Sequence, residues 1–194
     1  LKVRKSFVDE GGHFTGAVRS FCQCRESRSV FCIKGFPGPD KPYTGPPKKQ
    51  KIIVNNRYLG TVWQYQLGVD EGKQTIMDNL KVQSPGPKYC HFPLRDDYGA
   101  AYFNGLLSEH LVPEGKTRQR WIWKPIPGHE RNEPLDCRNY ALAAFQTLPV
   151  NLDAIDRRIK MAQGKAVPQE ETPPKPPRPR RRTYKPKDIG YDEW

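Results

Sequence analysis

Hydrophobic and polar positions follow two different periods in the first part of the chain. Residues 3–8 begin and end with valine and stop at an acidic, glycine-rich turn, which predicts a strand. From residue 13 onward the apolar positions recur at helical spacing, and they place on one face Phe14, Val18, Phe21 and Cys22. Residues 29–35 are again a compact apolar run, typical of a buried strand. A strand, a crossover helix and a second strand in this order predict a parallel α/β pairing.

The pattern beyond residue 35 predicts a further mixture of strands and helices. Residues 35–51 are rich in proline, glycine and lysine without periodicity, and we expect a loop. Predicted strands cover 52–54, 59–67 and 89–92, and a late strand or ribbon covers 117–126. Predicted helices cover 70–80 (with Asp70 as its cap), 98–111, 133–148 and 151–163. The fold class that follows is α/β, with a mixed sheet flanked by helices.

Composition and charge divide the chain into a domain and a tail. Residues 1–163 are sufficient for one domain with its own core, although only 36 per cent of the whole chain is hydrophobic. Residues 164–194 are rich in proline and arginine and almost without aliphatic residues, so we expect a disordered tail. The start lacks both a methionine and a signal-peptide core, which is typical of a segment of a longer chain.

The charge balance favours a polyanionic partner. Lysine and arginine number 33 against 21 acidic residues, giving a formal net charge of +12. Neutralised phosphates release condensed counterions, so nucleic acid is the natural partner, although a merely soluble basic surface has the same balance. No apolar run approaches the eighteen or so residues of a membrane span, and the odd cysteine count favours reduced thiols in a cytoplasm.

Asp9 is the first candidate functional residue. It stands where the first predicted strand ends, and the carboxyl end of a strand is where α/β sheets usually bind ligands. Gly11 and Gly12 follow it and would allow a phosphate to approach the backbone closely. An ordinary Asp-Gly turn is the alternative interpretation.

The start of the helix predicted at 133–148 holds the second group of candidates. Glu133 and Asp136 are three residues apart and therefore share a helix face. Small and apolar residues behind them predict close packing of this helix against the sheet. Acidic residues that merely compensate the helix dipole are the alternative.

Several other kinds of chemistry lack their motifs. Residues 11–18 have two glycines at P-loop separation but not the following lysine and hydroxyl, so no ATPase is encoded in this segment. The histidines show no metal-ligand spacing, Cys22, Cys24 and Cys32 do not have the spacing of a zinc site, and no nucleophile-elbow serine is present.

At its candidate residues the chain resembles the nuclease half of the phage terminase large subunit, in the lambda-type GpA family. Four stretches carry the resemblance, in family order: Asp9-Glu10-Gly11-Gly12-His13, then residues 30–35, then Tyr89-Cys90-His91-Phe92-Pro93, then residues 131–144. The resemblance covers roughly residues 3–148.

This resemblance implies an RNase H-like nuclease fold and an endodeoxyribonuclease activity. In such a site acidic residues hold two divalent ions, Mg²⁺ or Mn²⁺. Motif matching makes Asp9 and Asp136 the catalytic residues and metal ligands. The second-tier candidates are Glu10, Glu133, His13, His91 and Lys34.

The resemblance also carries expectations about what lies outside this sequence. The family pattern has a further aspartate on a strand upstream of Asp9, which would precede Leu1, and an upstream ATPase domain. The chain would then be incomplete, and whether it cuts DNA alone is a question for experiment. Expected partners are double-stranded DNA, the terminase small subunit and the prohead portal, in the host cytoplasm.

The tail and the basic residues complete the expectations. The tail is expected to dock onto the portal through Ile189, Tyr191 and Trp194, with DNA binding by the basic residues 178–182 as the alternative. The approach to the acidic residues is predicted to be lined by Lys48, Lys49, Lys51, Arg57, Arg118 and Arg120. The alternative functions are another RNase H-like nuclease, of resolvase or transposase type, and a non-catalytic DNA-binding or portal-docking module.

Overall fold

The computed structural model of the chain describes residues 3–39, 41–115, 120–129 and 131–164. The chain forms two compact units, Leu1–Pro149 and Val150–Trp194. Among the described residues, every strand and all helices but the last belong to the first unit, so we describe that unit first.

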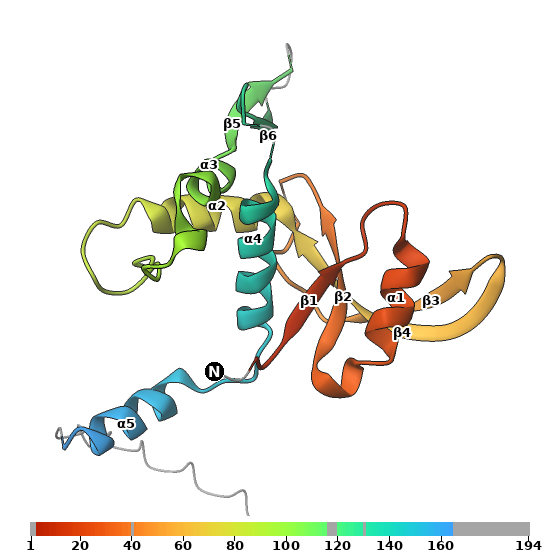
Figure 1. Cartoon of the computed structure of the whole chain (residues 1–194), viewed down its shortest axis with the longest axis horizontal. Helices are drawn as coiled ribbons and strands as arrows, with labels where there is room; N and C mark the ends of the chain where they lie inside the picture. Colours follow the sequence, from red (N-terminus) through yellow and green to blue (C-terminus); the bar gives the residue numbers. More distant parts are fainter. Residues whose placement is uncertain (1–2, 40, 116–119, 130, 165–194) are drawn as a thin grey trace, which may run out of the picture. The chain divides into compact units, whose positions relative to one another are not determined.

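The first unit is built on a four-stranded mixed sheet in the order β1-β2-β4-β3. Its strands are β1 (Ser6–Asp9), β2 (Val30–Phe36), β3 (Lys48–Val54) and β4 (Arg57–Gly68). β1, β2 and β4 run parallel, and β3 pairs antiparallel with β4. Helix α1 (Thr15–Gln23) connects β1 to β2, followed by the short 3₁₀ turn η1 (Glu26–Arg28) (Figure 1). The predicted parallel strand–helix–strand unit is therefore confirmed.

The hairpin between β3 and β4 corrects the loop that we expected over residues 35–51. Its tight turn is made by Asn55 and Asn56, both at positive φ (49° and 59°), the backbone that a two-residue hairpin needs and that asparagine tolerates. β3 begins already at Lys48, within the stretch predicted as a loop. Lysines are common on edge strands because they discourage pairing with other chains. In β3 they interrupt the apolar alternation from which a strand is predicted.

Each face of the sheet packs against a different helix. Cys32 and Ile33 are neighbours on β2 and are both fully buried, but they point to opposite faces. Cys32 joins a cluster with Cys22 of α1, whereas Ile33 joins a cluster with Ala143 of helix α4 (Glu133–Gln146). The sheet is thus sandwiched between α1 and α4, which confirms the α/β prediction. The RNase H-like assignment remains a prediction.

A third core cluster joins three helices beside the sheet. Helices α2 (Val69–Leu80) and α3 (Ala100–Leu106) both pack on α4, and Figure 1 shows α4 between them and β1. The buried members are Ile76, Leu106 and Leu135, one from each helix. α4 is therefore the element that connects the sheet to the helical part of the unit.

Two predicted elements are wrong in detail. Residues 89–92 form no strand, because Phe92 packs among aromatic rings near the 3₁₀ turn η2 (Asp96–Tyr98) and α3 instead of pairing in a sheet. The helix predicted over 98–111 is replaced after Leu107 by β5 (Glu109–Glu114), which pairs antiparallel with β6 (Arg120–Pro125). This pairing confirms the predicted ribbon, of which residues 117–119 lie outside the described residues.

Two expected side-chain roles also differ. Asp70 does not cap α2, because its carboxylate instead accepts a hydrogen bond from the Gly38 amide at 3.1 Å. On α1 the predicted apolar face is only partly buried: Cys22 is fully buried, whereas Phe14 is 77% exposed. The apolar spacing located both helices but not these contacts.

The second unit contains helix α5 (Leu152–Ala162), within the helix predicted at 151–163. Asn151 caps it, accepting a hydrogen bond from the Ala154 amide at 2.9 Å. The predicted tail begins at Gly164, and residues 165–194 lie outside the described residues. Among the described helices, none combines the length and apolar character that crossing a membrane requires.

Candidate active site

Asp9 ends β1 at the sheet edge where the parallel strands finish. One carboxylate oxygen, Oδ1, accepts a hydrogen bond from the Gly11 amide at 2.8 Å. The other, Oδ2, accepts one from the Tyr140 hydroxyl of α4 at 2.9 Å. Gly12 has φ +113°, so the turn after Asp9 needs the glycine there. The carboxylate is exposed but held at both oxygens.

Asp136 lies in the first turn of α4, four residues before Tyr140. Residues at this spacing are neighbours on one helix face, about 5–6 Å apart at their Cβ atoms. Burial raises the pKa of the Asp136 carboxyl, and the negative charges of Glu109 and Asp9 raise it further, whereas the Lys73 ammonium lowers it. Asp9 and Asp136 therefore act on each other electrostatically, with Tyr140 beside both. The pKa of the Tyr140 hydroxyl is raised by its burial and by these two carboxylates.

A polar network lies on the other side of Asp136. Lys73 of α2 donates to both carboxylate oxygens of Glu109, at 2.8 and 2.7 Å, and its ammonium lies 3.5 Å from Asp136 Oδ1. Asn132 donates to Glu109 Oε1 at 2.8 Å and to Asp136 Oδ2 at 3.1 Å. The two donors thus bridge the two carboxylates.

Sequence reasoning missed Lys73, Glu109 and the hydroxyl role of Tyr140. One signal for Lys73 was available: it is placed between Val69 and Ile76 on the apolar face of α2, where a lysine is unusual. No comparable signal exists for Glu109, because it was predicted inside a helix and is the first residue of a strand.

Glu10 has a structural environment that the sequence did not indicate. Its side chain is fully buried and binds Arg19 of α1 through both oxygens, at 2.7 and 2.8 Å. The Gln64 amide of β4 also donates to it. Glu10 is therefore not a surface charge. This ion pair instead fixes α1 on the sheet beside Asp9.

The other second-tier candidates are exposed. Glu133 is the first residue of α4, and His13 lies between β1 and α1. His91 packs edge-on against the Tyr89 ring, with centroids 4.8 Å apart, and the Lys34 ammonium of β2 lies 6.0 Å from the Phe36 ring. Within the part of the chain that the structure describes, no cluster of three or more histidine, cysteine, aspartate or glutamate side chains could hold a metal ion.

The predicted DNA-binding lysines line the edge of the sheet opposite β1. Across the sheet, Asp9 of β1 pairs with Ile33 of β2, and Ile33 pairs with Tyr65 of β4. The residue before Tyr65, Gln64, pairs with Lys48 of β3. Lys48 thus lies nearly level with Asp9, three strand spacings or about 14 Å across the sheet. Beside it, a hollow of about 400 Å³ between α1 and β3 is lined by Thr15, Gly16, Arg19, Lys49, Gln50, Lys51 and Ile53.

The remaining residues predicted to bind DNA are Arg57, Arg118 and Arg120. Arg57 begins β4 at the hairpin turn and is exposed. Arg120 begins β6 and pairs with Glu114 at 3.1 Å. Arg118 lies outside the described residues.

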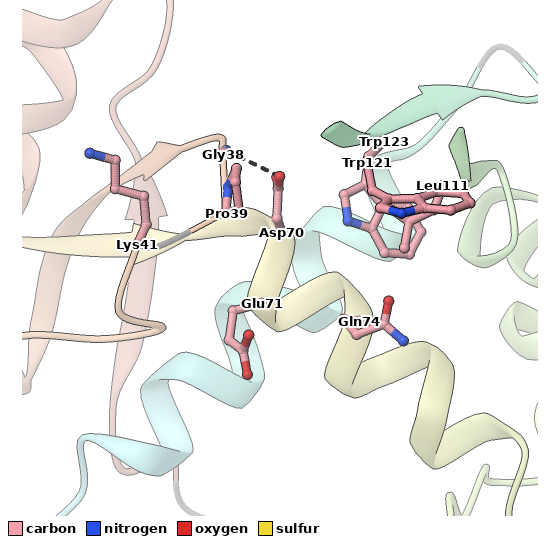
Figure 2. A pocket seen from close by; sticks show the side chains of 9 residues that line it. All are labelled: Gly38, Pro39, Lys41, Asp70, Glu71, Gln74, Leu111, Trp121 and Trp123. Carbon is pink, nitrogen blue, oxygen red and sulfur yellow. Dashed lines mark hydrogen bonds between the residues drawn. The ribbon is translucent and has the colours of Figure 1, made fainter. Parts of the chain in front are cut away.

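The ribbon also carries two tryptophans that border a hollow of about 180 Å³. Figure 2 shows Trp121, Trp123 and Leu111 gathered on one side, facing Gln74 and Asp70 of α2. Neither Asp9 nor Asp136 lines this hollow. A second hollow of about 320 Å³ shares Trp123 and is lined by Lys73 and Glu109 as well. The polar network beside Asp136 therefore borders a cavity below the ribbon.

Fold and site together define an α/β domain with an acidic centre at one edge of the sheet and basic residues at the other, a combination typical of proteins that act on nucleic acids. The chain belongs to the family of the terminase large subunit gpA endonuclease domain, whose family model matches residues 1–159. This confirms the family resemblance and implies a DNA-cutting role in phage packaging. Comparisons with curated proteins and with solved structures gave no match.

Proposed function

We propose that this chain is a divalent-metal-dependent endodeoxyribonuclease domain that cuts double-stranded concatemeric phage DNA. Two observations carry the proposal: Asp9 raises the pKa of Asp136, 127 positions later in the numbering, and Tyr140 of the same helix as Asp136 donates a hydrogen bond to Asp9. The family match favours this function over a resolvase-type or transposase-type nuclease.

The donor chemistry of the two aspartates fits Mg²⁺ or Mn²⁺. Magnesium prefers hard oxygen ligands and is commonly bound through one or two carboxylates together with water and substrate phosphate. Each Asp9 oxygen accepts one hydrogen bond and keeps further acceptor capacity. When bound, such ions stabilise the negative charge that develops on the attacking and leaving oxygens of the cut strand. The family resemblance implies two ions per site.

The chain's own residues hold the acids and the substrate. The Gly11 amide and the Tyr140 hydroxyl orient Asp9, while Asn132 and Lys73 contact Asp136. The lysines of β3 would contact the phosphates of the duplex, fixing its position without reading its sequence. The place at which the duplex is cut would therefore depend on where these lysines hold it, and not on base contacts that they make.

The partners of the wider packaging machine are part of the same proposal. The small subunit and an upstream ATPase domain would deliver DNA to this domain, and the tail would dock the chain onto the prohead portal in the host cytoplasm. Truncation after Gly164 tests the tail: we expect the thermal unfolding of the remaining chain to be unchanged while prohead binding is lost. Retained prohead binding together with weaker DNA binding would instead identify a basic DNA arm.

Plasmid cleavage tests the nuclease proposal directly. The chain is incubated with supercoiled DNA and Mg²⁺ or Mn²⁺, with EDTA as the metal-free control. We expect nicking that requires the metal and that falls at least a hundredfold in Asp9→Asn and Asp136→Asn, because each removes a charged ligand (roughly 3 kcal/mol). Asp78→Asn, on an exposed carboxylate of α2, is the matched control and should cut normally. Equal cutting by all variants would reject the site.

A further inference from the structure

A buried ion pair lies directly beside Asp136. Lys73 is 6% exposed and Glu109 is 8% exposed, so both charges are removed from water. The pair is bidentate, with both oxygens of Glu109 within 2.8 Å of the same ammonium. The ammonium also approaches Asp136 Oδ1 at 3.5 Å, so one cation is shared by two carboxylates.

The hydrogen bonds of Asn132 support the same arrangement. It occupies the N-cap position of α4, where an asparagine side chain ordinarily accepts a hydrogen bond from the first turn of the helix. In this structure it makes no such bond. Its amide instead donates to Glu109 and to Asp136. The side chain makes no capping bond and instead connects the two carboxylates.

Stability alone does not account for the network. A buried ion pair loses the hydration of both ions, and replacing such a pair with apolar residues of similar volume is often neutral or stabilising. What the charged pair does supply is a fixed cation 3.5 Å from Asp136, whose side chain is 31% exposed. The contacts therefore favour a role in holding Asp136.

We propose that Lys73, fixed by Glu109 and assisted by Asn132, is a positioning residue that holds the Asp136 carboxylate in place for divalent-ion binding. Lys73 touches neither metal nor DNA in this role and acts only through Asp136. The inference rests on the proposed function, since it needs Asp136 to be a metal ligand.

The positioning role of Lys73 is tested by measuring Mn²⁺ affinity in variants whose folding stability is preserved. The whole 194-residue chain is titrated with Mn²⁺ by calorimetry, and its thermal unfolding is followed in parallel. Lys73→Met alone leaves Glu109 buried without a partner and should destabilise the fold. The double variant Lys73→Met/Glu109→Leu removes both charges, so it should recover stability while its Mn²⁺ affinity stays about tenfold below wild type. Lys81→Met, at the residue that follows the same helix, is the matched control, because Lys81 is exposed and pairs locally with Asp78.

The outcomes separate this inference from the proposed function. Wild-type Mn²⁺ affinity in the double variant would make the ion pair purely structural and overturn the inference alone. If the double variant does not fold, Asn132→Ala decides, because it removes a donor shared by Glu109 and Asp136 from a half-buried position. Unchanged Mn²⁺ affinity in that variant overturns the inference, and a drop of about threefold supports it. No Mn²⁺ binding by the wild-type chain would overturn the metal site itself, and this inference with it.

Discussion

At the scale of single residues, the Asp9 carboxylate is held by two donors from distant parts of the chain. The Gly11 amide is two residues away, whereas the Tyr140 hydroxyl is 131 residues away. The local donor follows from the turn, but the distant one exists only because α4 packs next to β1. Tyr140 therefore connects the orientation of Asp9 to the packing of the helix that carries Asp136.

Tyr140→Phe tests that connection. Loss of a hydrogen bond to a partly exposed carboxylate should cost about 1 kcal/mol, or roughly a fivefold decrease in cleavage rate. Tyr43→Phe is the matched control, because its hydroxyl donates to the Asn139 backbone of α4 at 2.9 Å and does not contact Asp9. The control should lose stability without losing cleavage. Equal cleavage rates in the two variants would show that the Tyr140 hydroxyl does not orient Asp9.

The raised pKa of Asp136 predicts a pH dependence of stability. Below its ordinary pKa of 3.8 the carboxyl is protonated in the folded and the unfolded chain. As the pH rises from 3.8 to the raised folded pKa, the unfolded chain loses its proton first, so this group lowers the free energy of unfolding. Asp136→Asn cannot ionise and should gain stability relative to wild type as the pH rises from 4 to 7. Urea unfolding at several pH values measures the difference, and a difference that is constant with pH would contradict the assignment.

At the scale of elements, α2 and α4 are in close contact at Gly72. A Cβ atom placed there would lie 1.9 Å from Asn139 Oδ1 and 2.4 Å from the Tyr43 ring. Asn139 is 1% exposed and is itself held to α2 through the Val69 carbonyl at 3.2 Å. The close approach is what brings Lys73, the next residue on α2, within reach of Asp136.

Gly72→Ala should therefore separate the two helices. Alanine favours a helix over glycine by about 1 kcal/mol, but the steric overlap at a buried position costs more, on the order of 2–3 kcal/mol. We expect a net loss of stability in urea unfolding, together with weaker Mn²⁺ binding because Lys73 moves. Gly45→Ala, whose added Cβ would meet nothing within 4 Å, is the control. A stabilised Gly72→Ala variant would show that the helices can shift without cost.

At the scale of the whole molecule, positive charge gathers on the sheet edge opposite Asp9. Lys48 and Lys49 are exposed on β3, and Lys49 stacks over the Trp63 ring at 5.1 Å. Together with the net charge of +12 this edge would attract a duplex whose phosphates span the distance to the acidic centre.

Lys48→Glu/Lys49→Glu tests the sheet edge as a DNA contact. If both lysines neutralise phosphates, the variant should bind duplex DNA more weakly, and the slope of log affinity against log salt should fall by about 1.8. Lys81→Glu changes an exposed lysine just after α2 and should leave the slope near that of wild type. Identical salt slopes in all three proteins would mean that the β3 lysines are only a solvated surface.

Local sequence patterns determined the elements whose periodicity is regular and the residues that short motifs mark. The parallel β1–α1–β2 unit, helix α4 and the aspartates at their ends follow from apolar spacing, turn glycines and matching motifs within a few residues of one another. Only tertiary packing decided the strand at β3, the change from helix to β5 at Glu109, and the absence of a strand at residues 89–92. The same packing brought Tyr140 to Asp9 and Lys73 to Glu109 and Asp136. These contacts join residues from separate elements, and a pattern confined to one segment holds no information about which side chain a distant segment will bring against it.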